Sequence, residues 1–355
     1  MDEKRAQESE RVNGILRRLA SQIRGERVPP HAAGKPNDAP AMGEGKGPAA
    51  STLPSAGLPD ARTDISLDSA VEALRSTVAS MRASGAATPA APPSQVEMRL
   101  AAVADALAKE RVEVCLEPIL ALADDRASHF EVTVRLKSPT GEMIDAREAL
   151  EKASSAQASG AGLLPVLDAL GLRHSSGIAL KLERRGRQGS VFSQVSGESL
   201  RDPRFVSDVA GRHAQGIADR MVLTFAQDEV QGLGPAQHSV LGSLSQLGFR
   251  FSLRDVAHLD MDFEELRPLG FEFVKLDAEM FLKGLTLGNA TVPPTDLCRF
   301  FADQGLSIIV GQIEDEWVRA RILGFGVVFG QGTLFGGPRP IQVGASPAQG
   351  SQVVA

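Results

Sequence analysis

The chain has 355 residues, of which 43% are hydrophobic, and its formal net charge is −6. This length is enough for one large domain and an additional segment, and it is too great for a protein built on a single small core. The acidic balance, without clustered Lys and Arg, argues against a nucleic-acid-binding surface. The densest basic run, RRGRQG at 184–189, is interpreted as a solvated loop between strands.

Cysteine usage and hydropathy give expectations about the cellular compartment. Cys115 and Cys298 lie far apart in apolar stretches, which favours two buried thiols over a disulfide. The sequence shows no apolar run of about 18 residues, so we expect no transmembrane helix. The first residues lack the apolar core of a signal peptide. These features predict a cytoplasmic protein.

Residues 1–94 are predicted to be mostly disordered, with two short amphipathic helices at about 10–24 and 66–84. The segment 25–60 is rich in Pro, Gly and Ala, so burial cannot offset its ordering entropy. Helices this short are marginal in water. We expect the first to become ordered on a protein partner or by weak membrane contact. A third helix, over 95–110, is expected to link to the following domain and dock on it, and residues 343–355 are expected to form a flexible tail.

Strand and helix patterns alternate from Arg111 onward. Strands are predicted at 112–120, 130–136, 178–182 continuing near 191–195, 221–225, 250–253, 271–276, 307–310 and 326–329. Helices are predicted at 146–156, 163–175, 202–215, 236–247, 262–269, 294–304 and 315–323. About eight strands with intervening helices favour an α/β fold of the TIM-type (β/α)8 barrel over an open doubly wound sheet. The absence of GxGxxG after the first strand further disfavours a dinucleotide-binding fold.

Eight short segments, in order, give the region a family resemblance. They are CLEPILAL (115–122), FEVTVRL (130–136), VFSQVSGESLRDPRF (191–205), LTFAQ (223–227), FSLRDVAHL (251–259), FVKLD (273–277), IIVGQIE (308–314) and FGQGTLFGGPRP (329–340). The region 111–342 resembles the EAL-domain family, whose active members are barrel phosphodiesterases that linearise cyclic di-GMP. The resemblance places Glu131 on the first metal-binding Glu of the family and Arg135 on the arginine that contacts the nucleotide phosphate.

The sequence departs from the family pattern where chemistry would occur. Gln194 replaces a ligand Asn, Thr224 replaces a ligand Glu, Arg254 replaces the first Asp of an Asp pair, and Gly311 replaces a further Glu. The positions that still match are Glu131, Asp255, Lys275, Glu314 and Gln331. The resemblance therefore indicates a degenerate member.

Arg254 is the departure with the largest electrostatic consequence. Magnesium requires hard oxygen ligands. Two unit positive charges about 4 Å apart repel by about 4 kcal/mol at an effective dielectric near 20, and a divalent ion doubles this. We therefore expect no metal, no required cofactor and no catalysis. Arg254 is expected to pair with Glu131 or Asp255, or to hold a ligand phosphate in bidentate fashion.

Three further residues each have two interpretations. Lys275 could position a phosphate or neutralise Asp255, and Arg135 could contact the ligand or stack on the rim. Glu117 replaces a family Gln near where a guanine edge would lie; its charge argues against nucleotide binding, although Glu can accept guanine N–H donors. No histidine spacing suggests zinc, and neither Ser196 nor Ser252 has a histidine base at a suggestive spacing.

Three functions follow from this pattern. The first is an effector that binds cyclic di-GMP without cutting it and acts through protein partners, reached by the N-terminal helices or the barrel surface. The second is a protein-interaction scaffold that binds no nucleotide, and the third is a residual phosphodiesterase. The sequences of several segments resemble those of the degenerate EAL proteins of the TipF type. This resemblance implies a flagellar or cell-pole role, with recruitment to the pole or to a membrane by a partner. A homodimer through 255–263 and the following helix is a further expectation.

Overall fold

The computed structural model describes residues 95–155 and 162–341. The two predicted N-terminal helices and the predicted C-terminal tail lie outside these residues. Helix α3 (Gln95–Ala108) precedes the barrel and buries Leu100, Val103 and Leu107 on one face. It packs against α4 (Ala146–Ser155) and β2 (Arg126–Lys137), so the expected docking of this helix on the domain is observed.

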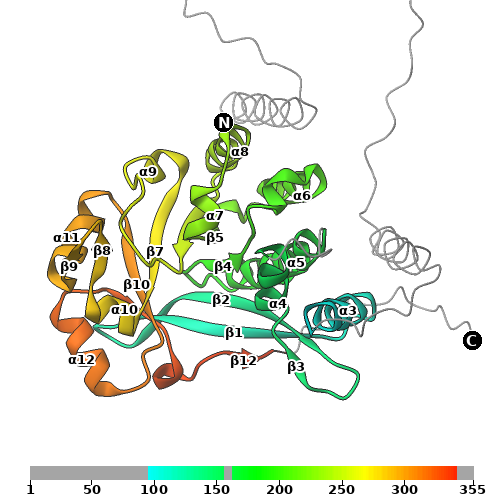
Figure 1. Cartoon of the computed structure of the whole chain (residues 1–355), viewed down its shortest axis with the longest axis horizontal. Coiled ribbons are helices and arrows are strands. Elements are labelled where there is room, and N and C mark those ends of the chain that lie inside the picture. Colours follow the sequence, from blue (N-terminus) through cyan, green and yellow to red (C-terminus); the bar gives the residue numbers. More distant parts are fainter. Residues whose placement is uncertain (1–94, 156–161, 342–355) are drawn as a thin grey trace, which may run out of the picture.

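Ten strands form one sheet in the described part of the chain, and the pairing of β1 with β2 closes it into a barrel (Figure 1). The ring consists of β1 (Val112–Ala121), β2, β4 (Val191–Gln194), β5 (Met221–Ala226), β6 (Arg250–Arg254), β7 (Phe271–Asp277), β10 (Ser307–Gly311) and β11 (Phe329–Gly330). Strand β1 is antiparallel to both its neighbours, whereas the other ring strands are parallel. The predicted (β/α)8 barrel is confirmed.

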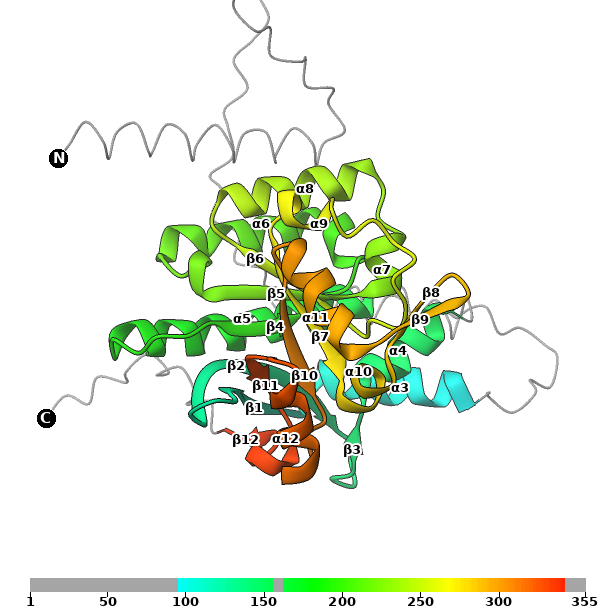
Figure 2. The same ribbon diagram turned by 90° about the vertical axis from the view of Figure 1, so that its left-hand side faces the viewer.

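Short strands extend the barrel or lie apart from it. Strands β3 (Met143–Ile144) and β12 (Arg339–Pro340) pair with β2 and β1, outside the ring. Strands β8 (Leu285–Leu287) and β9 (Ala290–Val292) form a separate hairpin. Helices cover the outside of the barrel (Figure 2). They are α4, α5 (Leu163–Arg184), α6 (Pro203–Gly211), α7 (Gln227–Gln231), α8 (Pro235–Gln246), α9 (Leu266–Leu269), α10 (Ala278–Lys283), α11 (Pro294–Asp303) and α12 (Glu316–Gly324).

Several predicted elements were wrong in detail. Residues 178–182 form the last turns of α5 rather than a strand, because Leu172, Ala179 and Leu182 are buried at helical spacing. The basic run 184–189 therefore connects a helix to β4 and not two strands. The predicted helix 202–215 ends at Gly211 and is followed by a 3-10 turn, and only α9 is helical within 262–269.

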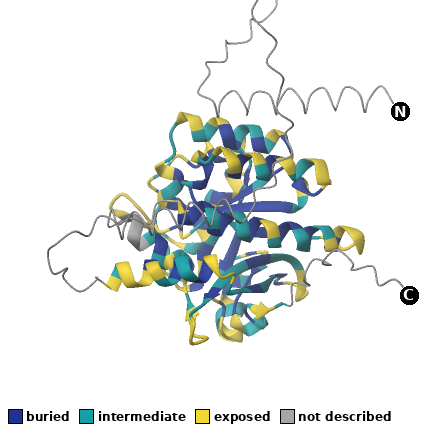
Figure 3. Cartoon of the chain, turned by 90° about the vertical axis from the view of Figure 1, so that its right-hand side faces the viewer, coloured by how far each residue is buried: buried dark blue, intermediate teal, exposed yellow. Residues whose placement is uncertain are grey.

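The alternation of side chains along the strands builds two cores. Outward residues such as Leu223, Phe225 and Phe251 pack against the surrounding helices. Inward residues fill the barrel, and these are Ile119, Phe192, Val222, Phe273 and Ile309. Figure 3 shows the strands as the most deeply buried part of the molecule. Of the two cysteines, Cys115 is buried as expected, but Cys298 is only partly buried; both are free thiols.

His129 adds a titratable group to the inward core. Its ring contacts Phe192, Phe273 and Phe329 edge-on, and Nδ1 accepts a hydrogen bond of 3.2 Å from the Ser190 amide. Burial, together with the positive charge of Arg250, lowers the pKa of His129 from 6.5 to about 4. The imidazole is therefore neutral in the folded protein near pH 6, where the unfolded chain begins to bind a proton.

We expect His129 to make folding stability fall in acid. Between pH 6.5 and about 4 the unfolded state holds a proton that the folded state lacks, so stability decreases as the pH falls through this window. The loss should be about 2 kcal/mol for this partly buried ring. Denaturant unfolding of His129→Gln, which keeps an acceptor for Ser190, should show a smaller acid-dependent loss than the parent. An equal loss in both proteins would contradict this role.

Candidate functional site

Four of the predicted site residues belong to a layer of inward side chains above the apolar barrel core: Glu117, Glu131, Lys275 and Gln331. Side chains two positions apart on a strand point the same way. Two positions after an inward apolar residue, each strand therefore carries an inward polar one: Gln194 after Phe192, Thr224 after Val222, Lys275 after Phe273 and Gln331 after Phe329. Glu131 lies beside them on β2. The carboxyl ends of the parallel strands lie here, which is where ligands bind in barrels of this architecture. We call this layer the barrel mouth.

Glu131 is paired with Lys275 at the barrel mouth. Its Oε2 lies 2.5 Å from Lys275 Nζ and accepts a hydrogen bond of 2.7 Å from Gln331 Nε2. Burial works to raise the pKa of Glu131, but the Lys275 ammonium and these two hydrogen bonds outweigh it and hold the pKa below its usual range. Of the alternatives expected from the sequence, the pairing of Arg254 with Glu131 and that of Lys275 with Asp255 are not observed: Lys275 lies on β7 and contacts Glu131 across the barrel interior.

Glu117 places a second carboxyl group at the mouth. It lies directly opposite Glu131 in the antiparallel pairing of β1 and β2. Burial, followed by the charge of Glu131, raises the pKa of Glu117. The pKa values of the two acids are thus shifted in opposite directions: Glu131 is held ionised, and Glu117 is shifted toward its protonated form. A protonated carboxyl group donates as well as accepts a hydrogen bond.

Arg254 ends β6 and points into the protein rather than to solvent, since its side chain is 12% exposed. Its Nη2 donates a hydrogen bond of 2.7 Å to Glu151 of α4, and its Nη1 pairs with the adjacent Asp255. The predicted pairing with Asp255 is observed, whereas the contact with Glu151 was not predicted. Asp255 itself has a positive φ of 56° and lies at the surface. The guanidinium therefore joins the barrel to α4.

The donor set at the mouth does not fit a catalytic metal centre. At the mouth, four buried oxygens make no hydrogen bond to a described residue: Glu131 Oε1, Thr224 Oγ1, Ser252 Oγ and Gln331 Oε1. Only the first belongs to a carboxylate, and Lys275 already compensates that charge. No three His, Cys, Asp or Glu side chains in 95–155 and 162–341 converge as metal ligands. Hydroxyl and amide oxygens of this kind suit hydrogen bonds from a ligand better than they suit magnesium.

A cleft of about 510 Å³ opens beside the mouth, between β2, β4, α4 and α5. Arg135 lines it and makes no hydrogen bond or ion pair with any described residue, so its guanidinium is available at the cleft wall. Gln194 and Arg254 line the same cleft. Glu314 is exposed on the loop after β10 and does not line this cleft. The structure therefore groups Arg135, Gln194 and Arg254, and leaves Glu314 apart.

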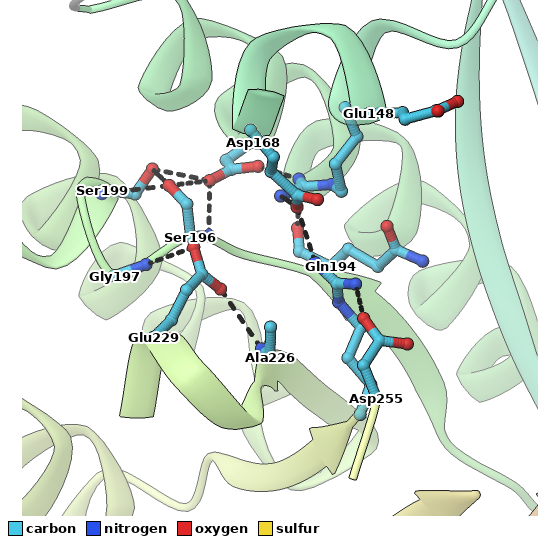
Figure 4. A network of polar contacts seen from close by, with 12 residues as sticks. Glu148, Asp168, Gln194, Ser196, Gly197, Ser199, Ala226, Glu229 and Asp255 are labelled. Carbon is cyan, nitrogen blue, oxygen red and sulfur yellow. Dashed lines mark hydrogen bonds and ion pairs between the residues drawn. The ribbon is translucent and has the colours of Figure 1, made fainter. Parts of the chain in front are cut away.

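A buried polar network beneath the cleft was not predicted. Asp168 of α5 is fully buried; it pairs with Arg147 and accepts hydrogen bonds from the Ser196 amide at 2.7 Å, Ser196 Oγ at 2.8 Å and Ser199 Oγ at 2.6 Å (Figure 4). Ser196 is thus a structural residue. The signal in the sequence was a lone acid within LLPVLDALGL, which places a charge on an otherwise buried helix face.

Glu229 holds the same loop from the other side. Its carboxylate accepts hydrogen bonds of 3.2 Å from the amides of Gly197 and Ala226 (Figure 4). Burial raises the pKa of Glu229, although the two amides and the charges of Arg254 and Arg147 oppose the shift. The loop after β4 is therefore fixed by Asp168 and Glu229, which lie on different elements.

Barrel closure through an antiparallel first strand, and a site at the carboxyl ends of the other strands, define the class of protein. The family model described as EAL domain matches residues 100–338, and the chain belongs to this family. No curated protein shows significant sequence similarity to the chain.

Solved EAL structures resemble the chain at low sequence identity. The FimX EAL domain from Pseudomonas aeruginosa bound to c-di-GMP has a TM-score of 0.55 and 22% identity, over 69% of this chain and 96% of that one. The FimX EAL domain from Xanthomonas citri in complex with c-diGMP has a TM-score of 0.54 and 16% identity, over 70% and 95%. The PaMucR phosphodiesterase in its c-di-GMP complex has a TM-score of 0.57 and 16% identity, over 69% and 98%. These similarities support the fold.

No helix among the described residues is long and apolar enough to cross a membrane.

Proposed function

We propose that the chain is a catalytically inactive EAL protein that binds cyclic di-GMP at the barrel mouth without hydrolysing it. The observation that carries this proposal is the guanidinium of Arg254, which is 12% exposed and paired with Glu151 and Asp255 at the end of β6, in the place where the family resemblance puts an acidic metal ligand. A fixed positive charge there repels a divalent cation, and the neutral side chains of Thr224 and Gln194 replace two further ligands. Phosphodiester hydrolysis of this type depends on such a cation to activate water and stabilise the developing charge.

Binding is supported by polar groups that have no protein partner. Arg135 presents a guanidinium at the cleft wall, and Gln331 and Thr224 hold buried oxygens without partners in the layer at the mouth. A guanidinium suits a phosphodiester, and buried amide and hydroxyl oxygens accept hydrogen bonds from a base. The FimX and PaMucR structures are complexes of EAL domains with c-di-GMP, which supports the same ligand class here.

The protein is proposed to pass the bound state to a protein partner, through its N-terminal segment or the barrel surface. A flagellar or cell-pole role, recruitment by that partner and a homodimer remain predictions from sequence resemblance. The nucleotide-independent scaffold is the second candidate function. It is favoured by Glu117, whose carboxyl group lies opposite Glu131 where a guanine edge would be placed.

Isothermal titration of the full chain with cyclic di-GMP distinguishes effector from scaffold. We expect binding that Arg135→Ala weakens at least tenfold, because a charge-assisted contact to phosphate contributes more than about 1.4 kcal/mol. The matched control is Arg126→Ala, which removes an exposed arginine from the opposite end of the same strand and should leave the affinity unchanged. No heat of binding at high nucleotide concentration, with a folded protein, would leave the scaffold function.

A further inference from the structure

Glu151 of α4 lies between two guanidinium groups at the edge of the cleft. Its Oε1 is 2.7 Å from Arg254 Nη2 and 3.7 Å from Arg147 Nη1. The two arginine side chains are 12% and 14% exposed, whereas the Glu151 side chain is 36% exposed. The cations are therefore fixed in the protein and the carboxylate faces the solvent side.

Each arginine has a second anionic partner apart from Glu151. Arg147 is held by the buried Asp168 and also donates to the Gln194 carbonyl at 3.4 Å. Arg254 is held by Asp255 at the end of β6. One donor edge of each guanidinium remains directed at Glu151, and Arg147 Nη1 makes no hydrogen bond there despite being buried. Two pre-positioned donor edges thus converge on a single anion.

The same groups line the cleft that contains Arg135. Figure 4 shows Gln194 and Asp255 on the barrel side of this cluster and Glu148 and Asp168 on the helix side. Three guanidinium groups, from β2, α4 and the end of β6, therefore face one space. Arginine forks bind phosphate oxygens in bidentate fashion, and phosphate offers more acceptor oxygens than a carboxylate does.

We propose that Arg147 and Arg254 form a phosphate-binding site and that the Glu151 carboxylate occupies it in place of the phosphate. In this account, which rests on the proposed nucleotide-binding function, one phosphate of the ligand competes with Glu151 for the two arginines. The phosphate would then bridge Arg147 of α4 and Arg254 at the end of β6, in place of the direct contact of Glu151 with Arg254. A ligand that binds the arrangement with Glu151 displaced shifts the population toward it.

A purely structural role for the cluster predicts the opposite result. If Glu151 only ties α4 to the barrel, removing its charge lowers stability and leaves anion affinity unchanged or weaker. If Glu151 occupies a phosphate site, Glu151→Gln raises anion affinity, because the competing charge is gone while the side-chain shape is kept.

The test measures cyclic di-GMP and inorganic pyrophosphate binding to full-length chains by isothermal titration. We expect Glu151→Gln to bind both at least tenfold more tightly than the parent. The matched control is Glu142→Gln, which removes an exposed acid from the turn before β3 and should match the parent. Adding Arg254→Gln to Glu151→Gln should abolish the gain in affinity. If that double variant does not fold, Arg254→Lys is combined with Glu151→Gln instead, because lysine keeps the charge but lacks the planar fork of arginine.

The outcomes separate this proposal from the proposed function. No gain for either anion in Glu151→Gln overturns the phosphate site. An arginine-dependent gain for pyrophosphate, with no variant binding cyclic di-GMP, supports the phosphate site and rejects the nucleotide function. Equal gains in Glu142→Gln would assign the effect to net charge and also overturn the site.

Discussion

Replacing Asp168 with alanine should destabilise the protein by about 3–5 kcal/mol, which is the usual cost of breaking a buried ion pair. The carboxylate is fully buried and has four donors, from Arg147, the Ser196 amide and the hydroxyls of Ser196 and Ser199. Its loss leaves a guanidinium that is 14% exposed without its main partner. Two buried serine hydroxyls also lose an acceptor, which adds to the cost.

Denaturant unfolding checks this expectation against a matched surface pair. Asp208 contacts Arg212 at 2.7 Å one turn along the chain, with its side chain 30% exposed. Asp208→Ala should therefore cost less than about 1 kcal/mol. If Asp168→Ala costs no more than Asp208→Ala, the buried network does not fix the loop after β4 as described.

Replacing Lys275 with methionine should also cost about 3–5 kcal/mol at neutral pH, because Glu131 is left as a buried charge with one hydrogen bond. The pH dependence should reverse sign. In the parent, the depressed pKa of Glu131 gives stability that is lost as pH falls. In Lys275→Met, the buried carboxyl group should titrate above its unfolded pKa, so acid should reduce the destabilisation.

A double variant isolates the interaction. Lys275→Met with Glu131→Gln removes both charges, and it should recover most of the lost stability, as replacement of whole buried pairs commonly does. The stability of the parent, both single variants and the double variant is measured by denaturant unfolding at neutral and mildly acidic pH. Additive losses in the double variant would show that Glu131 and Lys275 do not depend on each other, contrary to the pairing at the mouth.

Much of the fold was predictable because short apolar runs mark the strands of this chain. Residues 221–226 form an almost continuously apolar run that is buried at every position, as expected for a parallel strand covered on both faces, and residues 271–277 mix buried apolar side chains with partly exposed polar ones; both segments are strands. The error at 178–182 arose because IALKL alternates like a strand. Only the packing of α5 on β4 shows that Ala179 and Leu182 continue a helical stripe.

The membership of the barrel mouth was partly predictable, but its contacts were not. Strand positions place Glu131, Lys275 and Gln331 in one layer, which sequence resemblance anticipated. Which of these residues pair depends on how the barrel closes. Closure brings Lys275 into contact with Glu131, although the two lie 144 positions apart in the sequence. The contact of Arg254 with Glu151 joins the end of one strand to a helix that follows another, a distance in sequence of 103 positions. No local pattern encodes such a pair.

The most direct test of the account is the affinity of the full chain for cyclic di-GMP with EDTA and with excess magnesium, followed by recovery of the nucleotide. An arginine- and amide-based site with a neutralised Glu131 predicts the same dissociation constant in both conditions and intact cyclic nucleotide afterwards. Binding that requires the metal, or linear product in magnesium or manganese, would contradict it.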